Sequence, residues 1–128
     1  MERGASGTMR GQHGLRVQVQ QLPDRQAALI TAEGDIDHRT FEELSNAVRD
    51  ILDGGVVRLI IDLGQVGFVS SSGLGVFVSA VAEARGGGGD LVLVRPQPTV
   101  REVFSTAGLL DCLQVVADMD AALAVFGT

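Results

Sequence analysis

The chain has 128 residues, of which 45% are hydrophobic, and 16 acidic side chains against 10 basic ones give it a formal net charge of −6. This length suits one domain with its own core, and the acidic balance argues against nucleic-acid binding, which requires a concentrated basic face. All basic residues are arginines, so the absence of lysine excludes Schiff-base chemistry and the lysine of a P-loop.

The sequence gives no sign of membrane insertion or secretion. No apolar run approaches the roughly 20 residues that a membrane-spanning helix needs, and residues 1–7 lack the apolar stretch of a signal peptide. Cys112 is the single cysteine, so an internal disulfide cannot form. We therefore expect a cytoplasmic protein with no membrane span.

The first predicted elements follow a tail. Residues 1–14 lack apolar periodicity, which predicts a flexible N-terminal tail, and Met9 leaves open a shorter natural start. In residues 15–20 apolar and polar side chains alternate, as is typical of a half-buried strand. After a Pro-Asp turn, residues 27–32 form a second strand, and the short connection predicts an antiparallel hairpin.

A polar loop at residues 34–39 precedes the first predicted helix. Thr40 and Glu43 have the spacing of a capping box at its start. The apolar residues that follow recur at helical spacing and form one stripe: Phe41, Leu44, Val48, Ile51 and Leu52. The Gly54-Gly55 pair should end this helix.

Residues 56–63 form a nearly continuous apolar run, which predicts a central strand buried on both faces. A loop at residues 64–69 leads into a second helix that runs to about Arg85. Its predicted inner face consists of Leu74, Phe77, Val78 and Val81. The four glycines of residues 86–89 are interpreted as a flexible linker.

The remaining predicted elements are a buried strand at residues 91–94, a helix at 99–106, a short edge strand at 113–116, and a final helix capped by Asp118 or Asp120. Alternating strands and helices indicate a largely parallel sheet with right-handed crossovers. The sequence thus predicts one α/β domain over residues 15–128. Its mixed, mainly parallel sheet should have about five strands and be covered by about four helices.

Three serines, Ser70, Ser71 and Ser72, lie where the central strand leads into the second helix. In open α/β sheets, ligands bind at the carboxyl ends of the strands. A hydroxyl at a helix N-terminus is an ordinary cap, but a phosphate is also stabilised there by unpaired amides and the helix dipole. Phosphorylation would add about −1.5 to −2 charges, so both a cap and a switch remain open.

An enzymatic interpretation fits this segment poorly. A nucleophile elbow requires Gly-x-Ser-x-Gly; Ser71 is followed by Gly73, but Val69 occupies the position of the first glycine. His38 is the candidate base outside the tail, and the sequence offers no required orienting partner for it. We predict no catalytic residues, and a small serine hydrolase using Ser71 and His38 is the enzymatic alternative.

The residues Asp35, Asp37 and His38 form a compact polar cluster after the second strand. Such a cluster could bind a cation, but more often it caps the helix that follows. We predict that this loop is a cap, with no metal site and no cofactor.

Two segments together resemble the STAS family, in particular the stand-alone anti-sigma factor antagonists of bacteria. Gly34-Asp35-Ile36-Asp37, with the helix start after it, is similar to the family's Gly-Glu-Leu-Asp followed by Thr-Ala. Ser70-Ser71-Ser72-Gly73-Leu74-Gly75 is similar to its Asp-Ser-Ser-Gly-Leu-Gly signature. The order of the other elements agrees over residues 15–126, so the resemblance implies a STAS fold for nearly the whole chain.

The resemblance also implies a regulatory binding module. In this family the unphosphorylated antagonist binds an anti-sigma factor that is also a serine kinase, and a sigma factor is released. Phosphorylation by that kinase switches the antagonist off, and a PP2C-type phosphatase resets it. By position the acceptor is Ser71, with Ser70 and Ser72 as alternatives. The implied partner-binding residues are Asp35, Asp37, His38, Arg39, Ser70, Ser71, Ser72, Gly73 and Leu74.

One position departs from the family pattern, because Ser70 stands where the signature has aspartate. A neutral serine cannot orient the acceptor hydroxyl or respond to a phosphate as a carboxylate can. This departure keeps an alternative open, a non-phosphorylated scaffold subunit of a stressosome-like or lipid-transport complex. In either role we expect a monomer or a weak homodimer.

Overall fold

The polypeptide builds one mixed sheet whose strands follow one another in chain order. The computed structural model describes residues 6–10 and 14–126. Its strands are β1 (Ser6–Arg10), β2 (Arg16–Leu22), β3 (Ala27–Ile36), β4 (Arg58–Val69), β5 (Asp90–Val94) and β6 (Gln114–Val116). The pairs from β1 to β3 are antiparallel and those from β3 to β6 are parallel. The predicted mixed, mainly parallel sheet is confirmed, with one strand more than expected.

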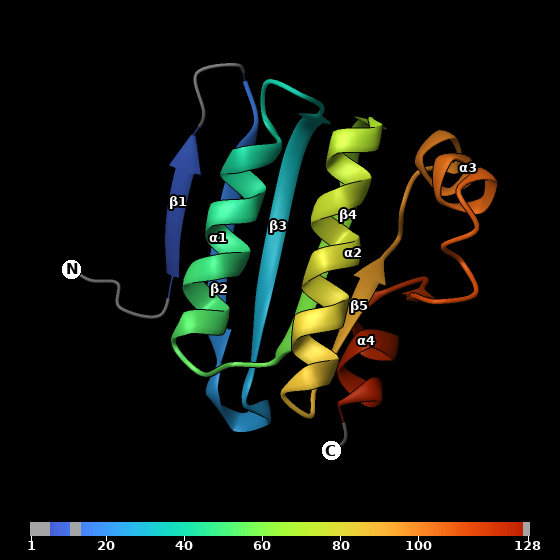
Figure 1. Ribbon diagram of the computed structural model, residues 1–128. Coiled ribbons are helices and arrows are strands. Elements are labelled where there is room, and N and C mark those ends of the chain that lie inside the picture. Colours follow the sequence, from blue (N-terminus) through green and yellow to red (C-terminus); the bar gives the residue numbers. More distant parts are fainter. Residues whose placement is uncertain (1–5, 11–13, 127–128) are drawn as a thin grey trace.

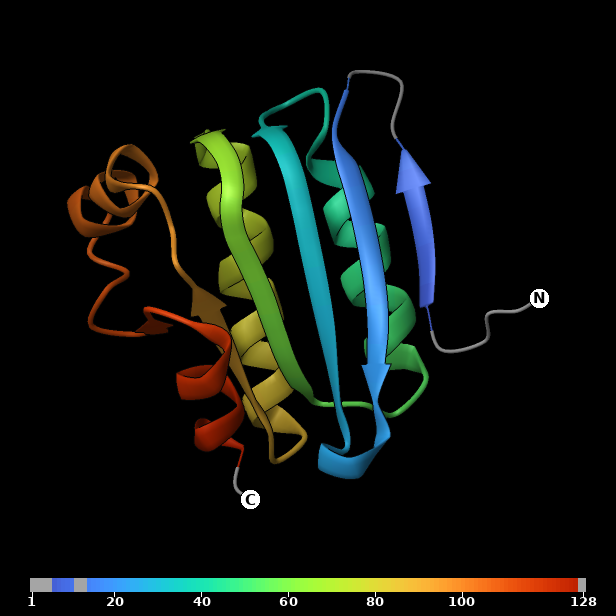
Figure 2. The ribbon, with the colours of Figure 1, turned by 180° about the vertical axis from the view of Figure 1, so that it is seen from behind.

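The helices of the described residues are placed on both faces of this sheet. They are α1 (Phe41–Asp53), α2 (Ser71–Gly86), α3 (Pro98–Thr106) and α4 (Met119–Val125), with a short 3-10 turn, η1 (Pro23–Arg25). α1 and α2 lie side by side on one face (Figure 1), and α4 covers the opposite face near β5 (Figure 2). α3 lies beyond the carboxyl end of β5. None of these helices is long and apolar enough to cross a membrane.

The strand β1 lies within the segment that was expected to be a flexible tail. It pairs antiparallel with β2, with Ser6 opposite Gln20 and Arg10 opposite Arg16. The tail prediction is therefore wrong for Ser6–Arg10, while the other parts of it that fall on residues 1–5 and 11–13 lie outside the described residues. Main-chain hydrogen bonds hold an edge strand without any apolar side-chain pattern, which is why periodicity did not indicate β1.

Both central strands run further than the sequence pattern predicts. β3 continues through Ile36, and β4 includes residues 64–69, although both ends were expected to be loops. The register between β3 and β4 shifts at two places. Such bulges interrupt the two-residue alternation by which a strand is recognised. The extension places Asp35 opposite Phe68 and Ile36 opposite Val69 at the carboxyl ends of the two strands.

The main core lies between the sheet and the layer formed by α1 and α2. Phe77 of α2 and Phe104 of α3 are fully buried there, and their rings meet edge to face with centroids 5.3 Å apart. Such a pair contributes about 0.5–1.5 kcal/mol beyond the burial of its area. A second cluster under α4 contains Ile60, Val92, Val94 and Ala122. β4 is thus covered on both faces over its first half, as predicted.

Two details of α2 and the turn after it differ from the predictions. Val78, expected to face inward, is 45% exposed, because α2 is apolar around most of its circumference and its pattern does not single out one face. The run of residues 86–89 is more than a linker, because Gly86 completes α2 and a Cβ on Gly89 would overlap the carbonyl oxygen of Val57.

Candidate functional site

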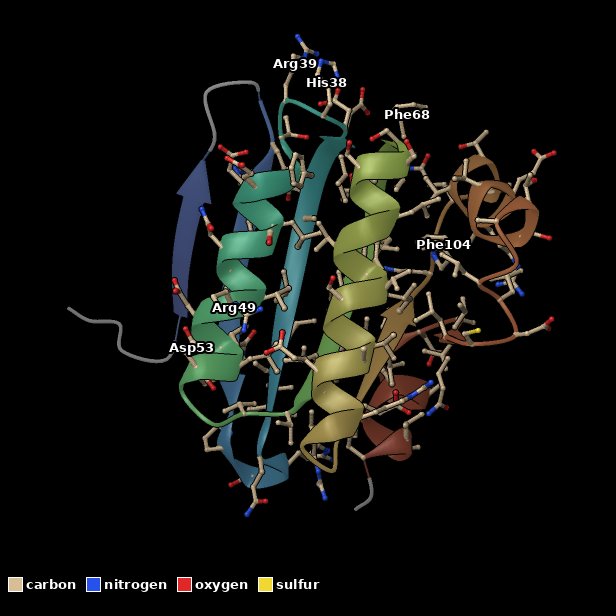
Figure 3. All side chains as sticks on the ribbon, viewed as in Figure 1. His38, Arg39, Arg49, Asp53, Phe68 and Phe104 are labelled. Atoms are coloured by element: carbon tan, nitrogen blue, oxygen red, sulfur yellow. The ribbon has the colours of Figure 1, made fainter. Side chains whose placement is uncertain are left out.

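The carboxyl ends of β3 and β4 bring together the two segments that carry the predicted site. We call residues 35–40 and 68–74 the carboxyl rim. The Ser70 N–H donates a hydrogen bond to the Ile36 carbonyl at 2.9 Å, which ties the start of α2 to the end of β3. In Figure 3 the side chains of His38, Arg39 and Phe68 point away from the sheet at this end.

The loop before α1 is held by the buried hydroxyl of Thr40. This hydroxyl donates to the Asp35 carbonyl at 2.7 Å and accepts from the Asp37 N–H at 2.9 Å. It makes no hydrogen bond to the first turn of α1. The predicted capping box of Thr40 and Glu43 is therefore wrong, because the threonine hydroxyl is already bonded within the loop.

Asp37 stabilises the same loop through its carboxylate. Its Oδ1 accepts the Arg39 N–H at 2.9 Å, and the Arg39 guanidinium lies 3.5 Å from Oδ2. The main-chain hydrogen bond from Arg39, followed by the charge of that guanidinium, lowers the pKa of Asp37 below its ordinary value. The prediction that the side chains of this cluster cap the helix is wrong, because α1 has no side-chain cap and the main-chain carbonyl of Asp37 accepts the N–H groups of Thr40 and Phe41 instead.

The three serines have different surroundings. Ser70 is the N-cap of α2, with extended backbone, and its Oγ accepts the Gly73 N–H at 3.3 Å. Ser71 is the first residue of the helix and is exposed, whereas Ser72 is half-buried. The predicted cap is therefore Ser70, and Ser71 presents its hydroxyl to solvent.

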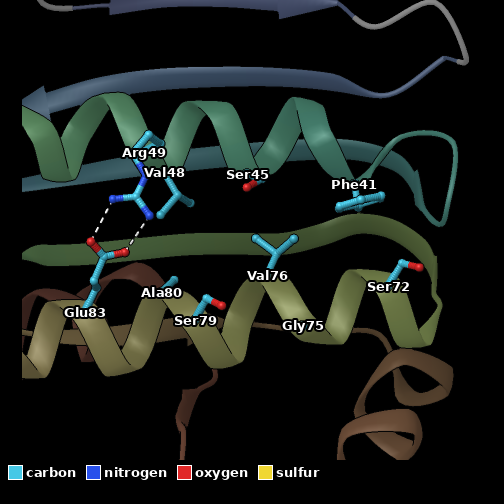
Figure 4. A pocket seen from close by; sticks show the side chains of 10 residues that line it. All are labelled: Phe41, Ser45, Val48, Arg49, Ser72, Gly75, Val76, Ser79, Ala80 and Glu83. Carbon is cyan, nitrogen blue, oxygen red and sulfur yellow. Dashed lines mark hydrogen bonds and ion pairs between the residues drawn. The ribbon is translucent and has the colours of Figure 1, made fainter.

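Two grooves flank α2, and neighbouring serines line different ones. A groove of about 440 Å³ separates α2 from α3; Ser71 and Leu74 face Thr99, Glu102, Val103, Thr106 and Ala107 across it. A groove of about 290 Å³ lies between α2 and α1 and contains Ser72 and Phe41 at one end (Figure 4). Arg49 and Glu83 close its other end through two hydrogen bonds of 2.7 and 2.6 Å.

Gly73 allows α2 to start close to the end of β3. A Cβ at this position would lie 2.8 Å from Ile36 Cγ2 and 2.9 Å from the Ile36 carbonyl oxygen. Only glycine lets the helix approach this closely without displacing β3. The glycine after the serines is thus required by the geometry of the rim, and it is buried.

The predicted site residues therefore divide into exposed and structural groups. Those exposed on the carboxyl rim are Asp35, His38, Arg39 and Ser71, and those partly or fully buried in it are Asp37, Ser70, Ser72, Gly73 and Leu74. In the part of the chain that the structure describes, no hydrogen bond joins the side chains of His38 and Ser71. Within residues 6–10 and 14–126, no cluster of His, Cys, Asp and Glu is arranged to hold a metal ion.

The sequence pattern missed two parts of this surface. Phe68 is 49% exposed and lies next to the serines, where the sequence pattern predicts a loop without a role. Its spacing of two residues from the buried Val66 indicates the wrong face, and its outward direction follows only from its neighbour, the buried Val69, once β4 is known to extend this far. The α3 wall of the larger groove comes from a distant segment, and a linear pattern contains no signal for that contact.

Comparisons with known proteins agree with this geometry. The family model described as STAS domain matches residues 16–122. A protein of Bordetella bronchiseptica named as an anti-sigma factor antagonist, BtrV, is 34% identical over 96 residues, which cover 75% of this chain and 83% of that protein. The anti-sigma F factor antagonist of Lysinibacillus sphaericus is 30% identical, over 70% of this chain and 77% of its own length.

Solved structures give the same fold. The anti-sigma factor antagonist SpoIIAA in its unphosphorylated form superposes with a TM-score of 0.74 and 26% identity, covering 88% of this chain and 97% of that chain. An anti-sigma factor antagonist of Mycobacterium paratuberculosis superposes with a TM-score of 0.78 at 20% identity, covering 94% of this chain and 100% of that one. Fold, signature geometry and family match agree, and the chain belongs to the STAS domain family.

Proposed function

We propose that this chain is an anti-sigma factor antagonist that binds its anti-sigma factor through the carboxyl rim. The observation that carries the proposal is the placement of Ser71, exposed at the first position of α2 and beside an apolar groove. The relatives named as anti-sigma factor antagonists align with most of this chain, and they support the same assignment. The protein acts by binding in the cytoplasm, without catalysis or a cofactor.

The switch in this proposal is phosphorylation of Ser71 by a partner that is both an anti-sigma factor and a serine kinase. Ser71 is the accessible serine of the three, because Ser70 is engaged as the N-cap and Ser72 is half-buried. A phosphate at the first turn of a helix is compatible with the fold, since it meets unpaired amides and the positive end of the dipole. It would add charge to the surface that the partner covers, and a PP2C-type phosphatase would remove it.

Ser70 supports this assignment in spite of its departure from the family aspartate. Its Oγ accepts the Gly73 N–H, and a serine and an aspartate are about equally effective as N-caps. The structural part of the aspartate's role is thus retained, while its negative charge is lost. We therefore expect the same acceptor, and a weaker influence of the neighbouring residue on phosphate transfer.

The experiment mixes the purified chain with ATP and each serine-kinase anti-sigma factor of the source organism, followed by intact-mass measurement and peptide mapping. We expect one added phosphate on Ser71, retained in Ser70→Ala and lost in Ser71→Ala. Without ATP, the kinase that phosphorylates the chain should bind it, and Ser71→Asp should weaken that binding at least roughly ten-fold, or about 1.4 kcal/mol. Asn46→Asp, which adds the same charge at an exposed position of α1, should bind like the wild type. Tight binding by Ser71→Asp contradicts the proposal.

The presence of a serine at position 70, where the family signature has aspartate, also favours a second candidate function. This candidate is a constitutive scaffold subunit of a stressosome-like or lipid-transport complex. This candidate predicts that every kinase tested leaves the chain unlabelled and that the chain co-purifies with a transporter ATPase or with other STAS proteins. The same mass measurement therefore separates the two candidates.

A further inference from the structure

A group of polar contacts far from the serines ties the start of α3 to the centre of the sheet. Asp62 of β4 is only 6% exposed. Its two carboxylate oxygens accept hydrogen bonds from Arg95 Nε at 3.1 Å and Nη2 at 2.9 Å. Oδ1 also accepts the Gly64 N–H at 2.9 Å. The arginine side chain thus connects the segment after β5 to the bulged part of β4.

The backbone of Arg95 is fixed as firmly as its side chain. Its φ of 44° lies in the left-handed region that residues with a Cβ seldom adopt. Its N–H donates to the Val116 carbonyl of β6 at 2.8 Å. Arg95 is therefore held by both neighbouring strands, in contrast to an ordinary surface ion pair between two flexible side chains.

Gln97 completes the connection at the beginning of α3. It is the N-cap residue of this helix, and its Nε2 donates to the Gly64 carbonyl at 3.1 Å. Both main-chain groups of Gly64 are thus engaged, one by Asp62 and the other by Gln97. We call Asp62, Gly64, Arg95 and Gln97 the α3 latch.

The Asp62–Arg95 ion pair is weak evidence for stability, because burying the carboxylate is costly and the Arg95 side chain, which is 57% exposed, remains in contact with water. What such a pair does provide is a defined geometry, since the guanidinium fork fixes direction as well as distance. The element whose position it defines is α3. That helix carries Thr99 and Val103, which face Ser71 and Leu74 across the larger groove.

We propose that the α3 latch consists of positioning residues for the partner interface: it holds α3 at the distance from α2 that shapes the groove beside Ser71. This inference rests on the proposed function, in which the partner covers that groove. The latch residues act through α3.

Two variants break the latch by different routes. A Cβ on Gly64 would lie 2.8 Å from Arg95 Nε, so Gly64→Ala displaces the guanidinium while both charges remain. Because the near atoms belong to the side chains of Arg95 and Asp62, with no backbone atom among them, and Gly64 has no positive φ, the fold should tolerate this change. Arg95→Gly removes the guanidinium and also relieves the left-handed backbone. Arg49→Gln, which breaks a surface pair with Glu83 between α1 and α2, away from α3, is the matched control.

We expect both latch variants to remain folded by circular dichroism and to bind the partner kinase roughly three- to thirty-fold more weakly than the wild type. The methyl NMR signals of Leu74 and Val103 should shift in both. The double variant should lose no more affinity than either single variant, because both changes remove the same contact. Arg49→Gln should leave the affinity and both methyl signals unchanged.

Wild-type affinity together with unchanged Leu74 and Val103 signals in Gly64→Ala and Arg95→Gly would overturn the proposal. Additive losses in the double variant would overturn it as well. If no kinase binds the wild-type chain, the proposed function fails, while the methyl spectra of the two variants still decide whether the latch positions α3.

Discussion

The two ends of the parallel strands are built in different ways. At the amino end, Arg58 Nη1 donates to the carbonyl oxygens of Arg25 and Phe126, both at 3.1 Å. The Asp90 carboxylate there accepts from Arg85 and Gln114. At the carboxyl rim, by contrast, an aromatic ring and a serine hydroxyl are exposed. Polar groups that bond within the fold close one end, and the other end leaves exposed the side chains that the proposed partner would cover.

The amino end should be the more sensitive one to added volume. Gly89→Ala places a Cβ onto the carbonyl group of Val57, so the turn after α2 must move, and we expect a loss of about 3 kcal/mol or more in the free energy of unfolding. Gly86→Ala, where a Cβ would meet nothing within 4 Å, should be neutral or stabilising. Urea denaturation measures both. Equal stability of Gly89→Ala and Gly86→Ala would contradict the close packing that we assign to the amino end.

At the carboxyl rim, a Cβ added at Gly73 should lower both the stability of the fold and the affinity for the partner. Gly73→Ala pushes the start of α2 away from Ile36, and we expect a loss of roughly 2 kcal/mol in the free energy of unfolding together with weaker kinase binding. Gly75→Ala, in the same helix but with open space around the added Cβ, should stabilise the fold by about 0.5–1 kcal/mol. Unfolding curves and binding titrations of both variants test this. A stable Gly73→Ala would show that the close approach is not required.

Alanine variants of the two neighbouring serines of the rim, Ser70 and Ser71, should affect different properties, one the stability of the fold and the other its phosphorylation. Ser70→Ala removes the N-cap of α2, and we expect a loss of about 1 kcal/mol in unfolding free energy. Ser71→Ala should change stability by less than about 0.5 kcal/mol, and under the proposed function it should abolish phosphorylation. Thermal unfolding and intact mass, measured on both variants, check the pair. The reverse order of stabilities would mean that Ser70 is not the cap.

The smallest effect should come from the ion pair across the α1–α2 groove. Hydrogen bonds from Arg49 lower the pKa of Glu83 below its ordinary value of 4.5. A carboxyl whose pKa is lower in the folded state stabilises the fold above that ordinary value, and this contribution is lost as the pH falls through the folded-state pKa. Wild type and Glu83→Gln should therefore differ in melting temperature at pH 7 and converge below about pH 4.5. A difference that grew on acidification would contradict this assignment.

Much of the fold could be predicted because local rules and tertiary structure agree over most of the chain. The order of elements from β2 to α4 follows from periodicity and from glycine and proline signals. Side-chain chemistry predicted a serine cap for α2 and either Asp118 or Asp120 for α4; the structure selects Ser70 and Asp118, whose Oδ1 accepts the Ala121 N–H at 2.9 Å. Where a local rule such as periodicity or capping determines an element, the sequence is sufficient to predict that element.

The predictions failed where the deciding contact joins distant segments. The length of β4 depends on its pairing with β3 across two bulges in β4, and the bonding of the Thr40 hydroxyl depends on the Asp35 carbonyl at the end of β3. The direction of Val78 depends on which side of an evenly apolar helix meets the sheet. The α3 wall of the groove depends on Arg95 reaching Asp62. None of these contacts leaves a periodic trace in the sequence.

The claim that the carboxyl rim is the partner surface is tested most directly by amide hydrogen exchange on the unphosphorylated chain with and without its kinase. We predict new protection in residues 35–40 and 68–78, and none in residues 23–26, 54–57 and 86–89 at the amino end. Phosphorylation of Ser71 should remove that protection. Protection confined to the amino end, or unchanged by the phosphate, would contradict the account.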